Sequence, residues 1–158
     1  MFRELRRKDK EISIEEVKCL LIEERRGVLA VNGDDNYPYA IPINYLYDEE
    51  ENKIYFHGSS VGHKADSILK SDKVCFTVYG KEIIKEEIWA PYLKSVVVFG
   101  RCHKISDRDS VIELTRKFAN KYYPDSKLVD IEIEKSGKAV CIYEIEIEHL
   151  SGKEIQEK

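Results

Sequence analysis

The sequence has no long apolar run and no paired cysteines. No window of its 158 residues approaches the ~20 apolar residues of a membrane-spanning helix, and the charged N-terminus lacks the apolar segment of a secretory signal. Its four cysteines stand singly, without the C-x-x-C spacing of a zinc site, and fit buried thiols in a reducing compartment. We therefore expect a cytoplasmic protein without a bound metal.

Net positive charge is also missing. The formal net charge is -4, and nucleic-acid binders need a basic surface, so the composition weighs against that class. The one basic run, Arg3–Lys10, contains acids and is best explained as a solvated arm. The length and a hydrophobic fraction of 42% suit one globular core. We expect a single domain over residues 1–158, with residues 1–10 as a flexible arm.

Several enzyme motifs are absent, among them G-x-S-x-G, H-E-x-x-H and G-x-G-x-x-G. The stretch Ile54–Lys70 instead reads as a strand, a glycine-bounded loop and a helix start, an arrangement that can hold a phosphate. It is not a P-loop, because only three residues separate Gly58 from Gly62 and Ala65 stands where magnesium needs a hydroxyl. A phosphate monoester on a larger cofactor fits better. The alternative is an ordinary loop in which Lys64 is solvated.

Hydrophobic periodicity predicts a chain rich in strands. Ser13 and Glu16 form a capping box that starts a helix, which Gly27 should end, and Gly100 marks a bulge in a long strand. The predicted strands are Gly27–Val31, Tyr37–Tyr47, Lys53–Gly58, Lys73–Tyr79, Lys94–Ile105 and Ala139–Leu150, and the predicted helices are Ser13–Arg26, His63–Lys70 and Asp107–Tyr123, the last stopped by Pro124. Six strands joined mostly by hairpins favour a β-rich α+β fold built on an antiparallel barrel.

The strand Tyr37–Tyr47 has a bulky face and a small face. Ala40, Pro42 and Asn44 lie on the small face, where a planar ring could rest against the backbone. The alternative is a strand that packs its bulky face inward and shows a plain small face to solvent. His57 ends the following strand beside the glycine loop, where it could donate a hydrogen bond to a ligand or move a proton, or serve only structure.

Five segments occur in order along the chain: RRKDKEI, YPYAIPINYLYD, IYFHGSSVGHK, KSVVVFGR and LSGKE. Together they resemble the nitroimidazole-resistance (Nim) group of the pyridoxamine 5'-phosphate oxidase-like flavoproteins, from about Arg6 to Lys153. The resemblance implies a six-stranded split β-barrel that forms a homodimer and binds FMN at the subunit interface. The positions that it assigns to FMN are Ala40, Pro42, Ile43, Asn44, Tyr45, His57, Gly58, Ser59, Gly62, His63, Lys64, Ser95 and Val96.

The resemblance also implies an activity. His57 matches a histidine near the flavin to which a catalytic role is assigned, whereas His63 replaces a frequent arginine and Leu150 a frequent aromatic residue. The implied enzyme is an FMN-dependent oxidoreductase that takes electrons from NAD(P)H and reduces small aromatic acceptors such as 5-nitroimidazoles. We do not expect vitamin B6 oxidation, because the extended C-terminus of true pyridoxamine-phosphate oxidases is missing. The alternatives are a flavin-binding or sensing protein without turnover, and a haem-binding barrel.

Overall fold

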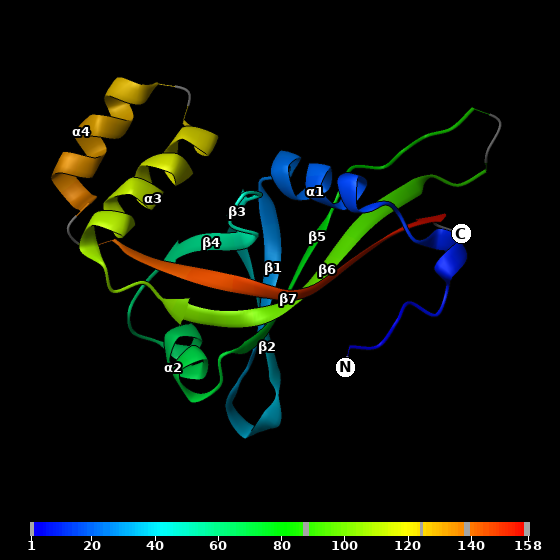
Figure 1. The fold of residues 1–158 in the computed structure, drawn as a ribbon, viewed down its shortest axis with the longest axis horizontal. Helices are drawn as coiled ribbons and strands as arrows, with labels where there is room; N and C mark the ends of the chain where they lie inside the picture. Colours follow the sequence, from blue (N-terminus) through cyan, green and yellow to red (C-terminus); the bar gives the residue numbers. More distant parts are fainter. Residues whose placement is uncertain (1, 87–88, 124, 138–139, 157–158) are drawn as a thin grey trace.

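The computed structural model describes residues 2–86, 89–123, 125–137 and 140–156. Seven antiparallel strands form one curled, half-barrel sheet in the order β2-β1-β5-β6-β7-β4-β3, with helices at its rims (Figure 1). The strands are β1 Arg26–Asn32, β2 Pro38–Asn44, β3 Leu46–Asp48, β4 Lys53–Gly58, β5 Lys73–Tyr79, β6 Tyr92–Lys104 and β7 Cys141–Gln156. The helices are α1 Ile14–Glu23, α2 His63–Lys70, α3 Arg108–Tyr122 and α4 Ser126–Ser136, with 3-10 turns η1 Lys8–Lys10 and η2 Asp34–Asn36.

The sheet has seven strands rather than the predicted six, because the second predicted strand breaks at Tyr45. The Tyr45 side chain is fully buried, and its backbone N–H donates to the Tyr122 hydroxyl at 2.9 Å. The single hydrogen of that hydroxyl can go to the Tyr45 carbonyl at 2.7 Å or to the Arg25 carbonyl at 2.5 Å, so the backbone of Tyr45 faces α3 instead of a sheet partner. β2 therefore pairs with β1, and β3 pairs separately with β4.

Helix α1 begins as predicted but ends early. Ser13 accepts a hydrogen bond from the Glu16 backbone and donates its own backbone N–H to the Glu16 carboxylate, which confirms the capping box. The helix ends at Glu23, so the prediction that Gly27 terminates it is wrong. Gly27 belongs to β1, where a Cβ would come within 2.3 Å of the Phe76 ring, and its missing side chain serves close packing.

The remaining elements follow the predicted pattern with different lengths. β4, α2 and β5 have the predicted bounds, while β6 begins earlier and β7 runs farther than expected. The strand pairing shifts between Phe99 and Gly100, which confirms the bulge. Asp107 caps α3 by accepting from the Ser110 N–H, and the predicted stop at Pro124 lies outside the described residues. Helix α4 was not predicted.

The core lies inside the curl of the sheet. It combines alternate residues of the strands with one face of α1, and its most buried members include Leu21, Leu29, Tyr45, Ile54, Phe56, Phe76, Val78, Val96, Val98 and Ile145. A smaller cluster, in which Tyr55 and Ile142 meet Val111, holds α3 against β4 and β7. No helix within the described residues is long and apolar enough to cross a membrane. Near the N-terminus, Phe2 stacks on His149. That residues 1–10 form a flexible arm of a single domain stays a prediction.

Candidate functional site

The loop between β4 and α2 is held at its base and open at its tip. The Tyr143 hydroxyl donates to the Ser59 carbonyl at 2.8 Å, and Ser59 Oγ accepts from the Val61 N–H at 3.1 Å. Gly62 precedes α2 with a φ of 103°, a conformation that favours glycine, and gives the helix no side-chain cap. The first-turn N–H groups of α2 are therefore available to an anion, as is the Ser59 hydroxyl hydrogen.

Lys64 places a half-buried positive charge beside this loop. Its Nζ lies 5.2 Å from the Phe56 ring centroid and 5.9 Å from that of Tyr143, and burial lowers the pKa of Lys64. A Cβ on Gly58 would come within 2.6 Å of the same Nζ, so the glycine leaves the space that the ammonium group fills. Lys64 forms no ion pair within the described residues. An ammonium group without an ion pair there, on a helix whose first-turn N–H groups have no side-chain cap, suits a phosphate.

The His63 side chain is engaged elsewhere. Its ring stacks on Tyr39 with centroids 4.2 Å apart, and its Nε2 accepts from the Asp34 N–H at 3.4 Å. The Asp34 carboxylate lies 3.6 Å from that nitrogen and also binds Lys70 at 2.8 Å. The predicted role of His63 in phosphate binding stays a prediction, and in this arrangement its backbone N–H is better placed for it than its imidazole.

His57 stands at the mouth of a cavity of about 490 Å³ that joins β2 to β4. The cavity is lined by Arg26, Pro42, Ile43, Asn44 and His57. The His57 side chain is exposed. Its ring contacts the Phe118 ring edge-on, with ring centroids 5.1 Å apart. Desolvation lowers the pKa of His57, and the charge on Lys64 lowers it further, so both effects favour the neutral imidazole. A neutral imidazole can donate one hydrogen bond and accept another.

A second cavity, of about 400 Å³, continues from the first toward α3. It shares Arg26, Asn44 and His57 with the first and adds Phe118 and Tyr122, whose rings stack at 4.9 Å. The sequence analysis did not single out Arg26 or any residue of α3. One signal was present, because aromatic residues four positions apart lie on one face of a helix.

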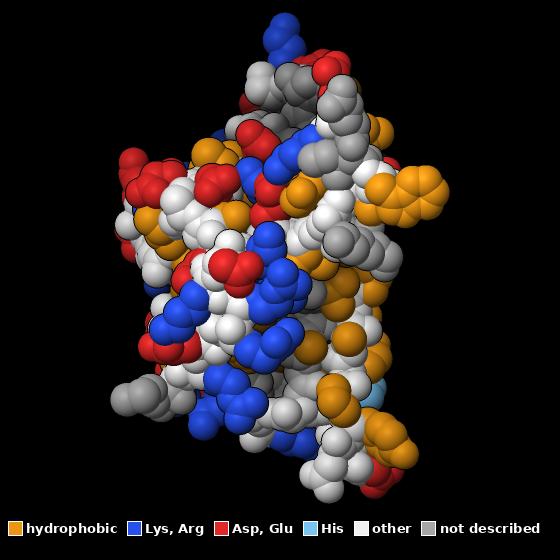
Figure 2. All heavy atoms as spheres, turned by 90° about the vertical axis from the view of Figure 1, so that its right-hand side faces the viewer, with side chains coloured by type: hydrophobic (Ala, Val, Ile, Leu, Met, Phe, Trp, Pro, Cys, Tyr) orange, Lys and Arg blue, Asp and Glu red, His pale blue; other side chains and the backbone are white. Residues whose placement is uncertain are grey.

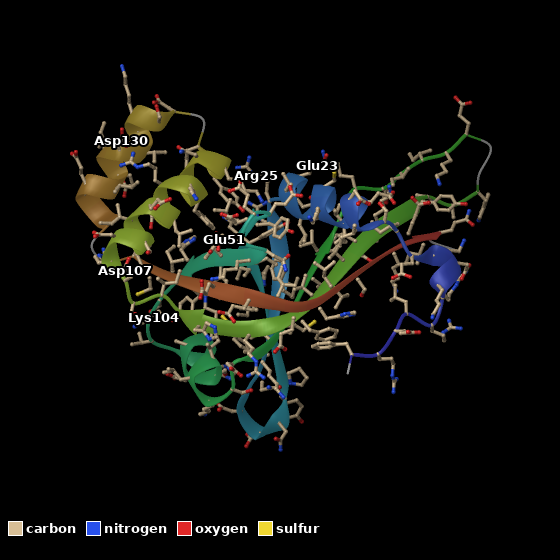
Figure 3. The ribbon with its side chains drawn as sticks, viewed as in Figure 1. Glu23, Arg25, Glu51, Lys104, Asp107 and Asp130 are labelled. Carbon is tan, nitrogen blue, oxygen red and sulfur yellow. The ribbon has the colours of Figure 1, made fainter. Side chains whose placement is uncertain are left out.

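The end of α3 fixes the chain segments that carry Arg26 and Asn44. Lys121 Nζ donates to the Glu24 carbonyl at 2.7 Å and lies 4.2 Å from the Tyr45 ring centroid, and burial lowers the pKa of Lys121 to about 8. Arg25 lies between the ends of α1 and α3 (Figure 3) and donates to the Tyr122 carbonyl at 3.1 Å. The turn before β1 and the break after β2 are thus fixed by one helix end.

The structure gathers only part of the predicted FMN set. Ala40 and Pro42 are exposed and alternate with half-buried neighbours, so the small face of β2 does point outward. The side chains of Tyr45 and Val96 are fully buried, which leaves only backbone atoms for a ligand, and Tyr122 already binds those of Tyr45. Ser95 and Val96 lie on β6, which β1 and β5 separate from β2.

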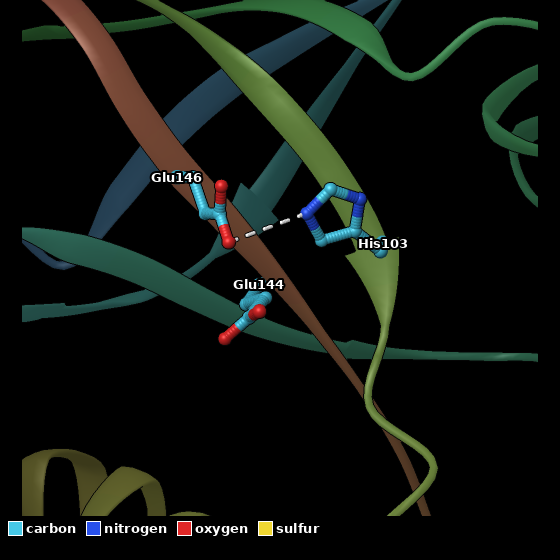
Figure 4. Close-up of side chains that lie close together, drawn as sticks. All are labelled: His103, Glu144 and Glu146. Atoms are coloured by element: carbon cyan, nitrogen blue, oxygen red, sulfur yellow. Dashed lines mark ion pairs between the residues drawn. The ribbon is translucent and has the colours of Figure 1, made fainter.

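Three side chains on the outer face of β6 and β7 could hold a metal ion. The ligand atoms of His103, Glu144 and Glu146 all lie within 4.8 Å of one another (Figure 4). His103 Nε2 is 3.7 Å from the Glu146 carboxylate, and Lys53 Nζ is 3.2 Å from that of Glu144. Sequence spacing could not reveal the group, because its members meet across strands. We assign it to surface ion pairing, since Lys53 already neutralises one carboxylate.

The fold and the loop–cavity arrangement together define a half-barrel protein in which an uncapped helix start follows a glycine-bounded loop near a pocket. Residues 13–154 match the family model described as pyridoxamine 5'-phosphate oxidase, and the chain belongs to that family. The family resemblance inferred from the sequence is therefore confirmed. No protein of curated function matches the chain.

Solved structures extend the likeness of fold. A candidate 5-nitroimidazole antibiotic resistance protein from Bacteroides thetaiotaomicron is 16% identical, with a TM-score of 0.76 over 92% of this chain and 87% of that chain. An FAD-binding protein from Mesorhizobium loti is 24% identical, with a TM-score of 0.63 over 92% and 97%. An FAD- and haem-binding protein from Mycobacterium smegmatis is 18% identical, with a TM-score of 0.73 over 94% and 74%. At these identities the likeness concerns the fold alone.

Proposed function

We propose that the protein binds FMN and works as an NAD(P)H-dependent oxidoreductase, a nitroreductase for small aromatic acceptors such as 5-nitroimidazoles. Bound FMN would supply the electron transfer between the nicotinamide and the acceptor. The observation that carries the proposal is the half-buried Lys64, which has no acidic partner within the described residues and lies against Gly58 at the open loop. The exposed small face of β2 then offers a surface for the flavin ring, and its residues Pro42 and Asn44 line a cavity together with His57.

In this proposal each part of the chain has one task. Lys64, the Ser59 hydroxyl and the first-turn N–H groups of α2 bind the phosphate. Ala40, Pro42 and Asn44 support the ring through the flat face of β2. His57 orients the acceptor by donating a hydrogen bond from its imidazole N–H. The stacked pair Phe118 and Tyr122 keeps water from one side of the cavity.

We further propose a cytoplasmic homodimer that completes the flavin site between its subunits. The hairpin between β5 and β6 projects from the sheet (Figure 1), and it exposes 82% of Ile84 and 97% of Trp89. The neighbouring end of the molecule carries basic side chains through its middle and hydrophobic ones along one margin (Figure 2). Exposed apolar groups of this kind favour a protein interface, and Ser95, remote from β2 within one chain, would reach the flavin from the partner.

The visible spectrum of the purified protein tests the cofactor. Flavin bands, or binding of added FMN, support the proposal, and a colourless protein without affinity for FMN contradicts it. Turnover is tested by anaerobic bleaching with NADH or NADPH, followed by reoxidation with a 5-nitroimidazole. A wild-type protein that binds FMN but is never reduced would be a flavin binder. If His57→Ala turns over as fast as the wild type, the role of His57 is wrong.

Haem is a second candidate, because one solved neighbour binds both FAD and haem. The His57 ring is partly exposed at the cavity mouth and makes no hydrogen bond within the described residues, so it could serve as an axial ligand. The same spectrum separates the two cofactors, since haem gives a Soret band that flavin lacks. A Soret band that disappears in His57→Ala would favour haem.

A further inference from the structure

Arg26 carries a positive charge that the described part of the chain does not use. It is the first residue of β1, its side chain is exposed, and it forms no hydrogen bond or ion pair there. Its neighbour Arg25 is committed, because it donates to the Tyr122 carbonyl and lies 4.8 Å from the Tyr122 ring centroid. The two adjacent arginines therefore differ, and only Arg26 can offer its guanidinium to a ligand.

This guanidinium stands where the two cavities meet. Arg26, Asn44 and His57 line both the 490 Å³ and the 400 Å³ cavity. The charge of Arg26 also acts on the Tyr122 hydroxyl, where it opposes the rise that burial causes in the pKa of Tyr122. Arg26 is thus close to the aromatic wall of α3 as well as to the histidine.

The aromatic walls of the cavity and the positive charge of Arg26 together favour a ligand that is flat and negatively charged. The stacked rings of Phe118 and Tyr122 suit a flat apolar ring. The planar fork of a guanidinium suits a carboxylate, which it can bind through two parallel hydrogen bonds. Glu132 also lines the 400 Å³ cavity, so an anionic group would sit on the Arg26 side, away from that carboxylate.

We propose that this pocket takes a planar aromatic molecule bearing a carboxylate, with the ring against Phe118 and Tyr122 and the carboxylate on Arg26. The inference rests on the proposed function for the fate of that molecule, since the oxidoreductase would reduce it as its acceptor. Its binding is a separate property of these side chains. Arg26 is then the residue that selects anionic over neutral acceptors.

The test compares two probes of nearly equal shape, 4-nitrobenzoate and its neutral amide 4-nitrobenzamide. Calorimetric titration of the FMN-loaded wild type should show at least tenfold tighter binding of the carboxylate. Arg26→Gln should bind both alike, and Arg26→Lys should keep part of the preference. Arg6→Gln is the matched control, because it removes one exposed arginine charge from the N-terminal segment and should keep the full preference.

Three outcomes would overturn the inference. The wild type would bind both probes equally, it would bind neither, or Arg26→Gln would keep the preference for the carboxylate. An FMN titration of Arg26→Gln should match the wild type, and a loss of FMN affinity with an unchanged probe ratio would mean that Arg26 serves the flavin. If the protein binds no FMN, the proposed function fails, yet the same titration of the flavin-free protein still decides whether Arg26 selects the carboxylate.

Discussion

At the scale of single residues, the site depends on side chains whose charge is left unbalanced by the fold. Burial opposes the charged form of Lys64 and so lowers its pKa, which is a cost that a bound anion would remove. Arg26 is exposed, and its side chain forms no ion pair within the described residues. Both cations act near His57, because Arg26 lines the same two cavities and the charge of Lys64 lowers the pKa of the imidazole, and each can hold a different part of what binds there.

Replacing Lys64 with alanine should weaken FMN binding at least tenfold. A charge-assisted hydrogen bond to phosphate contributes roughly 1.5–3 kcal/mol, and the substitution removes one. Quenching of FMN fluorescence on titration measures the affinity. Lys70→Ala is the matched control, since Lys70 ends the same helix and pairs with Asp34 on the surface. Equal FMN affinities of Lys64→Ala and Lys70→Ala would contradict the phosphate role of Lys64.

At the scale of elements, local signals predicted well and remote ones were missed. The capping box of α1, the apolar run of β4 and the alternation in β5 involve neighbouring residues, and these elements begin where the sequence predicts them. The break at Tyr45 depends on Tyr122, far along the chain, and no local pattern announces it. From the sequence alone, a tyrosine in a segment of strand-like composition is assigned to the strand.

The residues of the candidate site also fall into two groups, those that the sequence predicted and those that it did not. Pro42, Asn44 and the loop after His57 are short stretches whose composition is unusual by itself, and the structure brings them to one side of the sheet. Arg26 sits in a charged run that resembles any helix end, and its importance appears only when β1, β2 and α3 are placed together. In the proposed dimer, Ser95 would act on the flavin of the other subunit, which the sequence of one chain does not reveal.

A substitution at Gly100 tests the bulge in β6. Its Cβ position would lie 2.3 Å from the Glu146 carbonyl oxygen, so a methyl group must push the backbone of β7 aside. Overpacking of this kind costs about 1–3 kcal/mol, and Gly100→Ala should lower the melting temperature by several degrees. Lys104→Ala, at the exposed end of the same strand, should leave it unchanged. A wild-type melting temperature for Gly100→Ala would mean that the strand pair yields easily.

Lys121 makes the clamp of α3 sensitive to pH. Its pKa is about 8 when folded, against the usual 10.5, so between these values the unfolded chain holds a proton that the folded chain has released. The contribution of Lys121 to the free energy of unfolding therefore rises from pH 8 to pH 10.5. Denaturant unfolding should show the wild type gaining stability relative to Lys121→Met over this range. Cys75 and Cys102, whose raised pKa values act in the opposite direction, are common to both proteins. If the difference in unfolding free energy between the wild type and Lys121→Met is the same at every pH in this range, the lowered pKa of Lys121 is contradicted.

At the scale of the whole molecule, the exposed hairpin between β5 and β6 is the best candidate for the dimer contact. Trp89→Asp should shift the protein from dimer to monomer in sedimentation experiments, because it places a charge in an apolar contact. Leu128→Asp, on α4, changes a residue that is 61% exposed and far from the hairpin (Figure 1), and it should leave the dimer intact. Dimers in both variants would place the interface elsewhere.

Strand β7 has a consequence for the order in which the chain folds. It is the last strand in the sequence, yet it lies between β6 and β4, and its pairing of Ile145 with Ile54 joins distant parts of the chain. During synthesis β4 must wait, with only the short β3 beside it, until β7 has been made. Such non-local pairing is slow to form and leaves an unpaired edge open to wrong partners. The same strand that completes the sheet therefore sets the period in which a new chain is most prone to aggregate.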